Sequence, residues 1–251
     1  MNEFINNHRE EVKVELRLLQ QEEIQSSYAT RNKGIKKSKY DILAFIDSDC
    51  HPVENWLKEG IKTMLSKNAD LVGGNVKFTF EHKHNLAEIY DSISNAQFET
   101  DIKNRGLAKT GNLFIKKEVF KTLGLFPENF ISGGDVYFAK KATNNKFRLF
   151  YSPNAIVFHP SRTLIPLVKK QIRVGKGKAQ IWELNKLNNF EIFVNMVKYL
   201  TPPMPFSLAR KLSKINSVSK FSYPLVYCVA YICKFSTLAG ASWHLLSNKN
   251  I

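Results

Sequence analysis

Two carboxylates, Asp47 and Asp49, stand one residue apart directly after the apolar run of residues 42–46. An apolar run of this length, bounded by polar residues, predicts a buried strand. In open α/β sheets, ligands bind beyond the carboxyl ends of the strands, so the two carboxylates are expected at the ligand edge. Such a pair can chelate a hard divalent cation, Mg²⁺ or Mn²⁺, whose other ligands come from substrate phosphates. A solvated Asp-Ser-Asp turn is the alternative that the tripeptide alone leaves open.

The segments around this pair alternate between strand and helix patterns. Residues 13–19 alternate apolar and polar side chains, as a half-buried strand does. Further strands are predicted at residues 41–47, 69–80, 110–116 and, around a Ser-Pro-Asn turn, at two places within 147–160. Helices are predicted at residues 26–39, 52–67 and 85–100, and after the glycine-containing loop 132–135. This alternation favours an α/β fold with a mostly parallel sheet flanked by helices.

The last 90 residues of the chain are strongly basic. The formal net charge is +15, and residues 162–251 contribute 14 Lys and Arg against two acids, Glu183 and Glu191. A surface of this kind attracts a polyanion such as anionic lipid, nucleic acid or a phosphate-rich substrate. Nucleic acid is disfavoured, because the basic region lacks interleaved aromatic and basic residues or a recognisable binding motif.

The same basic region is also apolar. Residues 221–246 contain one charge, Lys234, and are long enough to span a bilayer. A lysine at the centre of a span costs about 2.5 to 3.5 kcal/mol, and the aromatic and lysine flanks suit an interfacial helix equally well. Membrane contact and a helical pair packed on the domain are the two alternatives. Three cysteines and a polar N-terminus indicate neither a disulfide framework nor a secretory signal, which predicts a cytoplasmic location.

Beyond these patterns, the stretch YATRNKGIKKSKYDILAFIDSDCHPVENWL resembles the centre of the family 2 glycosyltransferases of the GT-A fold. That family shows Ala-Arg-Asn-x-Gly-Ile, a spacer, an apolar strand ending in an Asp-x-Asp metal motif, and then Pro and Trp-Leu. The resemblance continues through TGNLFIKKEVFKTLGLFPENFISGGDVYFAKKA and YSPNAIVFHPSRTLIPLVKKQIRVGKG, and it covers roughly residues 12–180. It implies a GT-A-like domain over residues 1–185, followed by a basic, apolar helical extension over residues 186–251.

The resemblance implies roles by position. Asp47 and Asp49 match the metal motif and His159 matches a histidine near the metal, with Mn²⁺ or Mg²⁺ as the cofactor. Asp135 matches the carboxylate that serves as general base in inverting members, although an Asp here also suits the N-cap of the following helix. Donor contacts are implied for Arg31, Asn32, Ser48, Asn112, Gly133 and Gly134. Contacts with the departing diphosphate or a phosphorylated acceptor are implied for Arg162, Lys170 and Arg173.

One part of the family pattern has no recognisable counterpart here. Family members begin with two further strands that hold the nucleotide base, so this sequence resembles a chain that starts at the third strand. Residues 13–19 would then be an exposed sheet edge that is prone to pair with another chain. This implies a split or truncated product, or a partner chain that supplies the missing strands.

The sequence thus predicts a metal-dependent glycosyltransferase, inverting by family analogy, that moves a sugar from a nucleotide diphosphate sugar to a hydroxyl acceptor. The basic, apolar C-terminus favours acceptors at the inner face of the cell membrane, such as lipid-linked saccharides in cell-surface glycan synthesis. The main alternative is a catalytically inactive remnant or an accessory subunit that binds the membrane. A phosphatase of the haloacid dehalogenase type also ends a strand in Asp-x-Asp, but Cys50 and His51 do not fit that pattern.

Overall fold

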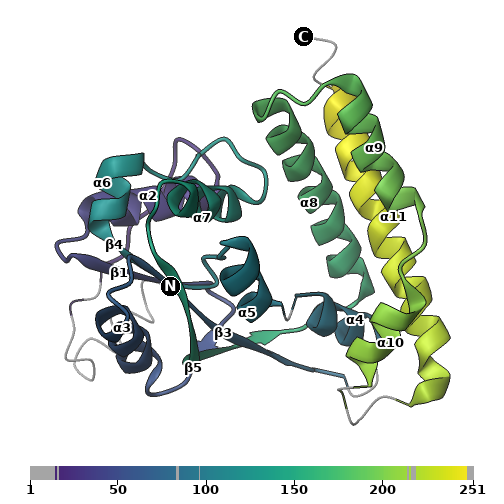
Figure 1. Ribbon diagram of the computed structural model, residues 1–251, viewed down its shortest axis with the longest axis horizontal. Helices are drawn as coiled ribbons and strands as arrows, with labels where there is room; N and C mark the ends of the chain where they lie inside the picture. Colours follow the sequence, from purple (N-terminus) through teal and green to yellow (C-terminus); the bar gives the residue numbers. More distant parts are fainter. Residues whose placement is uncertain are drawn as a thin grey trace.

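A five-stranded sheet in the order β1-β4-β3-β5-β2 lies at the centre of the α/β part of the molecule (Figure 1). The computed structural model describes residue 15 and residues 17–82, 85–95, 97–213, 215 and 219–247. Its strands are β1 (Ile42–Ile46), β2 (His51–Pro52), β3 (Leu71–Thr79), β4 (Asn112–Lys116) and β5 (Leu149–Pro160). The expected α/β layering is therefore present.

The sheet is mixed, which corrects the expectation of mostly parallel strands. Among the described strands, β3 and β5 form the one parallel pair. β4 runs antiparallel to both of its neighbours, β1 and β3, and β2 runs antiparallel to β5. The alternation of strand and helix patterns could not reveal this, because it does not fix the direction in which a later strand such as β4 enters between earlier ones.

Two strand predictions also change. The two short strands expected within residues 147–160 form the single strand β5, whose register against β3 shifts so that Gly74 lies opposite Ser152 and Asn75 opposite Ile156. The extra residues form a bulge at the predicted turn. Of the expected strand at residues 13–19, the described residues 15 and 17–19 are not in a strand, and residues 13, 14 and 16 lie outside the described part. The edges of the described sheet are β1 and β2, so the described residues of 13–19 do not form the expected sheet edge, and a partner chain that supplies further strands stays a prediction.

Helices cover both faces of the sheet because the strands alternate their side chains. In β4, Leu113 and Ile115 point to the face covered by α2 (Ser27–Lys37), α6 (Lys117–Leu123) and α7 (Gly134–Asn144). Phe114 points to the opposite face, covered by α3 (Trp56–Ser66). The absence of a side chain at Gly60 on α3 makes room for Phe114, since a Cβ there would lie 2.2 Å from the ring.

Within the helix expected at residues 85–100, the described residues form two separate helices. α4 (Leu86–Asn95) and α5 (Phe98–Thr100) are followed by a π-helical segment, η1 (Asp101–Arg105), which ends at Gly106 in the left-handed conformation (φ 66°). α4 presents Ile89 and Ile93 to the C-terminal helices, so it joins the sheet region to them.

The C-terminal part is helical. α8 (Leu164–Leu184), α9 (Asn189–Leu200) and α11 (Tyr223–Ser247) lie side by side, with α10 (Pro205–Leu212) at one end and the short 3-10 segment η2 (Lys220–Ser222) before α11 (Figure 1). α8 and α11 approach so closely at Gly175 and Gly240 that a Cβ on either would lie 2.0 Å from a carbonyl oxygen of the other helix. α8 precedes the predicted domain boundary near residue 185, yet it packs on α11, which follows that boundary. The division into two domains at this residue therefore stays a prediction.

α11 is the one helix among the described residues that is long and apolar enough, by length and composition, to cross a membrane. One face of it is buried against α8, α4 and α10 and includes Val226, Cys233 and Ala241. Another face exposes large apolar side chains, among them Leu225 and Phe235. Packing on the domain, one of the two alternatives drawn from the sequence, therefore accounts for part of the helix surface.

Candidate active site

Asp47 is the first residue beyond β1 and is held from two sides. The Arg31 guanidinium on α2 donates to the Asp47 carboxylate, with 2.7 Å between Nη2 and Oδ1. On another side lies Gly111, where a Cβ would come within 3.1 Å of Asp47 Oδ2. Ser48, which follows Asp47, is exposed. Asp47 is thus paired with a positively charged side chain of the protein itself and lies between α2 and the loop before β4.

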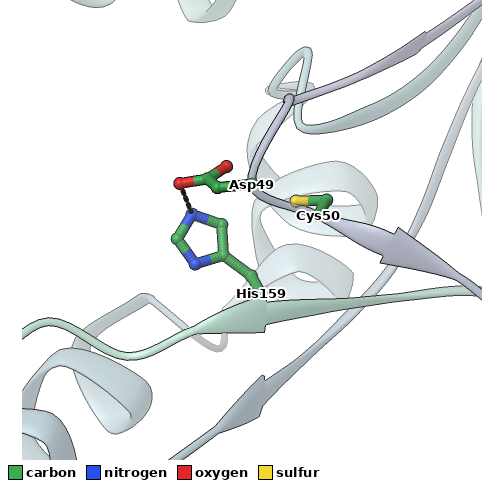
Figure 2. A group of neighbouring side chains, drawn as sticks. All are labelled: Asp49, Cys50 and His159. Carbon is green, nitrogen blue, oxygen red and sulfur yellow. Dashed lines mark ion pairs between the residues drawn. The ribbon is translucent and has the colours of Figure 1, made fainter. Parts of the chain in front are cut away.

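Asp49 meets His159 across the turn that follows β1 (Figure 2). The short strand β2 pairs His51 with Phe158 of β5, and this pairing brings the two residues together. His159 Nε2 lies 3.5 Å from Asp49 Oδ2, and with Cys50 these side chains form a group that could hold a metal ion. Of the predicted metal ligands, Asp49 and His159 are therefore adjacent, and Asp47 lies outside this group.

The His159 ring is oriented in the way that metal ligation requires. Its Nδ1 donates to the Pro160 carbonyl at 2.6 Å, so a neutral ring keeps its lone pair at Nε2, on the side of Asp49. A backbone carbonyl on the far ring nitrogen is a common way to orient a metal-ligating histidine. The ring also packs on Phe78, with 5.5 Å between the ring centroids. Carboxylate and imidazole donors at this place fit a divalent cation.

Cys50 was not among the predicted ligands. Burial, followed by the charges of Asp47 and Asp49, raises the pKa of the Cys50 thiol to about 12. A protonated thiol is a weak ligand, and Mg²⁺ and Mn²⁺ favour oxygen donors. Asp49 and His159 are therefore the better donors of the group for such an ion.

One of the three predicted cations, Arg162, lies at this pair. Arg162 Nη2 lies 3.2 Å from His159 Nε2 and 3.8 Å from Asp49 Oδ2. Arg162 and Lys170 share a second carboxylate, Asp91 on α4, which the sequence reasoning missed. The sequence did contain an indication of this carboxylate. Asp91 stands four residues after the buried Ala87, so it falls on the apolar face of an amphipathic helix.

Arg173, the third predicted cation, is exposed on α8 one turn beyond Lys170. Residues three apart on a helix lie on the same side, so Arg173 extends the basic side that begins with Lys170. Burial lowers the pKa of Lys170, and the Asp91 carboxylate opposes that shift.

Asp135 is held by donors from three segments. Oδ2 accepts from the Thr110 backbone N–H at 2.9 Å and from the Thr110 hydroxyl at 3.1 Å. Oδ1 accepts from the Val136 N–H at 3.0 Å and from the Tyr28 hydroxyl at 3.4 Å. A carboxylate has about four lone-pair positions, so a proton taken up by Asp135 requires one donor to move. The Tyr28 contact is the longest, and burial and then Asp135 raise the pKa of Tyr28 to about 12.

Asp135 is the second residue of α7, and the N-cap alternative is wrong. The N-cap is Gly133, whose left-handed backbone (φ 81°) favours glycine. Gly134 allows the Tyr28 ring to approach, since a Cβ there would lie 3.0 Å from it. Helix α2 therefore links the two ends of the site, with Tyr28 at Asp135 and Arg31 at Asp47.

Two of the predicted donor-binding residues point into the core. Asn112 is 1% exposed, donates to the carbonyls of Asn75 and Ala155, and accepts from the Trp56 indole. Asn32 is equally buried and bonds both backbone groups of Phe126. The contacts of both amides in this structure are with the protein itself, and a donor contact for either stays a prediction.

Comparison with solved structures identifies the fold. The chain superposes on a mannosyltransferase from Pyrobaculum calidifontis, solved with GDP-Man and Mn²⁺, with a TM-score of 0.59 at 15% identity, over 98% of this chain and 73% of that one. That likeness identifies the fold as GT-A-like, as the sequence resemblance implied.

The sequence comparisons then define the family. Residues 6–123 match the model of glycosyl transferase family 2. Over 238 residues the chain is 39% identical to Glycosyltransferase AglE of Haloferax volcanii, covering 93% of this chain and 78% of the relative. A pre-mycofactocin glycosyltransferase of Mycobacterium tuberculosis is 26% identical over 141 residues, 54% of this chain and 30% of that protein. The chain belongs to glycosyl transferase family 2 and is a glycosyltransferase.

Proposed function

We propose that this glycosyltransferase uses a divalent metal ion to move a sugar from a nucleotide diphosphate sugar to a hydroxyl acceptor, with inversion at the anomeric carbon. The observation that carries the proposal is the meeting of Asp49 and His159 at 3.5 Å directly beyond β1, with Arg162 beside them. The donor would carry a nucleotide such as GDP, because the mannosyltransferase of similar fold was solved with GDP-Man and Mn²⁺.

Asp49 and His159 would hold the metal ion, with Asp47 beside them on the diphosphate side. When bound, Mn²⁺ or Mg²⁺ supplies positive charge that stabilises the diphosphate as a leaving group. Arg162, Lys170 and Arg173 would add charge-assisted hydrogen bonds to the same anion or to a phosphorylated acceptor. Ser48 and Arg31 would contact the donor from the β1 and α2 sides.

Asp135 would act as the general base. Its carboxylate would take the proton of the acceptor hydroxyl while that oxygen forms a bond to the anomeric carbon. The bond from the anomeric carbon to the diphosphate would break in the same step, and its electron pair would leave with the nucleoside diphosphate. Tyr28 and Thr110 would orient the carboxylate, and Gly133 and Gly134 would leave room for the sugar.

The acceptor would be presented at an anionic membrane surface on the cytoplasmic side, such as a lipid-linked saccharide. Exposed apolar side chains recur along α11 at intervals of three or four residues, namely Leu225, Cys228, Ile232, Phe235, Ala239, Trp243 and Leu246. Phe206 on α10 and Phe221, just before α11, are 90% and 94% exposed. From residue 189 onward the chain has a single acid, Glu191, so the apolar surface lies among basic residues that favour anionic lipid.

The direct test is calorimetric titration of UDP and GDP into the purified chain with and without Mn²⁺. Binding of one nucleotide is expected to require Mn²⁺ and to weaken at least about tenfold in Asp49→Asn, because a metal ligand is lost. Asp70→Asn is the matched control. Asp70 also pairs with a lysine and an arginine, Lys116 and Arg148, but it precedes β3 at the opposite end of the sheet. A folded chain that binds neither nucleotide would support the alternative of an inactive remnant or accessory subunit.

A further inference from the structure

Asp91 on α4 is a fully buried carboxylate with four hydrogen-bond donors. Its side chain has 0% exposure. Oδ1 accepts from Lys170 Nζ at 2.9 Å and from Asn95 Nδ2 at 2.7 Å. Oδ2 accepts from the Arg162 backbone N–H at 3.1 Å and from Arg162 Nη1 at 3.4 Å. One carboxylate on α4 therefore binds Arg162, just before α8, and Lys170, within α8.

Stability alone is a weak reason for such a cluster. Desolvating a carboxylate and two cations is unfavourable, and apolar residues of similar volume usually stabilise a core as well or better. The charges are also unequal, because one carboxylate faces two cations, and the surplus positive charge lies on the side of Asp49. Lys170 is 17% exposed and Arg162 26% exposed, so both remain partly open to a ligand.

The contacts of the Arg162 guanidinium indicate a role for Asp91. Nη1 is bound to Asp91, while Nη2 lies 3.2 Å from His159 Nε2 and 3.8 Å from Asp49 Oδ2, so it is within hydrogen-bond distance of the histidine but not of the Asp49 carboxylate. We propose that Asp91 is a positioning residue that holds Arg162 beside the Asp49–His159 pair, with Lys170 bound to the same carboxylate, and that it keeps the Arg162 guanidinium from closing onto Asp49. The inference rests on the proposed function, and it adds a residue that acts through Arg162 and touches neither metal nor substrate.

Loss of the Asp91 charge has a defined consequence. The Arg162 side chain would lose one carboxylate, and the nearest remaining one is Asp49, which would then form a closer ion pair with it. A guanidinium paired with Asp49 competes with a metal ion for the same oxygens. Asp91→Asn should therefore weaken Mn²⁺ binding, and removal of the competing guanidinium in Asp91→Asn/Arg162→Gln should restore it.

The experiment measures Mn²⁺ affinity by calorimetry and by the electron paramagnetic resonance signal of free Mn²⁺, alone and with GDP or UDP. We expect about tenfold weaker Mn²⁺ binding in Asp91→Asn, the size typical for groups that orient metal ligands. The double variant is expected to bind Mn²⁺ within about threefold of wild type, a factor that corresponds to less than 1 kcal/mol, and yet to bind nucleotide diphosphate more weakly. Asp70→Asn, with its similar Lys116 and Arg148 partners, should bind Mn²⁺ as wild type does.

The possible outcomes separate the two proposals. A folded wild type that binds no Mn²⁺ in the presence of either nucleotide overturns the proposed function and this role with it. A wild type that binds, with Asp91→Asn binding equally well, overturns the role of Asp91 alone. Failure of the Arg162→Gln change to restore Mn²⁺ binding would reduce Asp91 to a structural residue. If Asp91→Asn does not fold because the Lys170 ammonium is stranded, Asp91→Asn/Lys170→Met carries the same expectation.

Discussion

Helices on both faces of the sheet cover the apolar side chains of β3 and β4, whereas α9 and α11 leave large apolar side chains in contact with solvent. Leu71 and Phe114 are 0% exposed, but Phe190 on α9 is 74% exposed and Phe221 beside α11 is 94% exposed. The two regions use polar residues differently as well. Around the sheet, carboxylates gather where β1 ends, while the described C-terminal helices carry mostly cations.

This difference indicates two tasks in one chain. Burial on both faces makes the sheet a rigid support, and rigid elements hold catalytic groups more accurately than loops do. An exposed apolar surface among cations is unfavourable in water and is expected where a protein meets another surface. The two regions meet at α4 and α8, where Asp91 joins them, so acceptor delivery and donor chemistry would be coupled at that place.

The largest effect is expected within the sheet region. Asp135→Asn keeps the size of the side chain but removes the proton acceptor, so kcat should fall about 10²- to 10⁴-fold. Nucleotide binding in the presence of Mn²⁺ should change little, because Asp135 lies with Tyr28 and Thr110 and not with Asp49. Steady-state kinetics together with calorimetry checks both parts. A variant that retains turnover would remove Asp135 from the role of base.

Thiol reactivity should distinguish the regions next. Cys50 is buried with its pKa raised to about 12, and Cys228 on α11 is exposed. At pH 8 iodoacetamide should therefore alkylate Cys228 faster by on the order of 100-fold or more, because the thiolate is the nucleophile. Peptide mass spectrometry over time measures the two rates.

The raised pKa of the Cys50 thiol also determines how the stability of the protein changes with pH. Between the ordinary thiol pKa of 9.0 and about 12, the folded state holds the Cys50 proton and the unfolded state releases it. The free energy of unfolding should therefore decrease as the pH rises through this range. Cys50→Ser, with a group that does not titrate there, should show a smaller decrease in denaturant titrations.

The junction between the helices gives an intermediate effect. Gly240→Ala places a Cβ 2.0 Å from the Ile172 carbonyl oxygen, so α8 and α11 must separate. The expected loss is about 1 to 3 kcal/mol in the free energy of unfolding, as for overpacked cores. Gly34→Ala on α2 is the control, because nothing lies within 4 Å of its Cβ position and alanine favours helix. Urea titration of both variants should give opposite signs, and equal effects would contradict the close approach.

The smallest effect concerns the exposed surface. Phe221→Ser should weaken binding to vesicles that contain phosphatidylglycerol by at least about tenfold, since a buried phenylalanine contributes about 1.5 to 3 kcal/mol. Tyr40→Ser on the sheet side, where Tyr40 is 76% exposed, is the matched control and should change nothing. Sedimentation with vesicles measures the binding, and protection of Cys228 from alkylation by the same vesicles reports on α11. Wild-type protein that stays in solution with anionic vesicles would overturn the membrane proposal.

The sequence predicted the local parts of the molecule well where one segment decides them. The apolar run before Asp47 formed a strand, and most of the helix expected at residues 52–67 formed as Trp56–Ser66, because side-chain period and chain punctuation act over a few residues. The predicted start of that helix was wrong, since Pro52 lies in strand β2, which depends on pairing with β5. The family, and with it the fold, followed from motifs in fixed order. Strand direction in β4 and the single bulged strand β5 did not follow, because they depend on which neighbours a strand meets.

For the candidate site as well, the sequence predicted some features and not others. Residue types and order were enough to single out Asp47, Asp49, Asp135 and His159 as groups able to carry chemistry. Tertiary structure alone decided that Asp47 pairs with Arg31 while Asp49 meets His159, that Asn32 and Asn112 face the core, and that Asp91 gathers Arg162 and Lys170. The physical reason is that a side chain's partners are set by contacts between segments far apart in the chain, such as the pairing of β2 with β5, which no local pattern encodes.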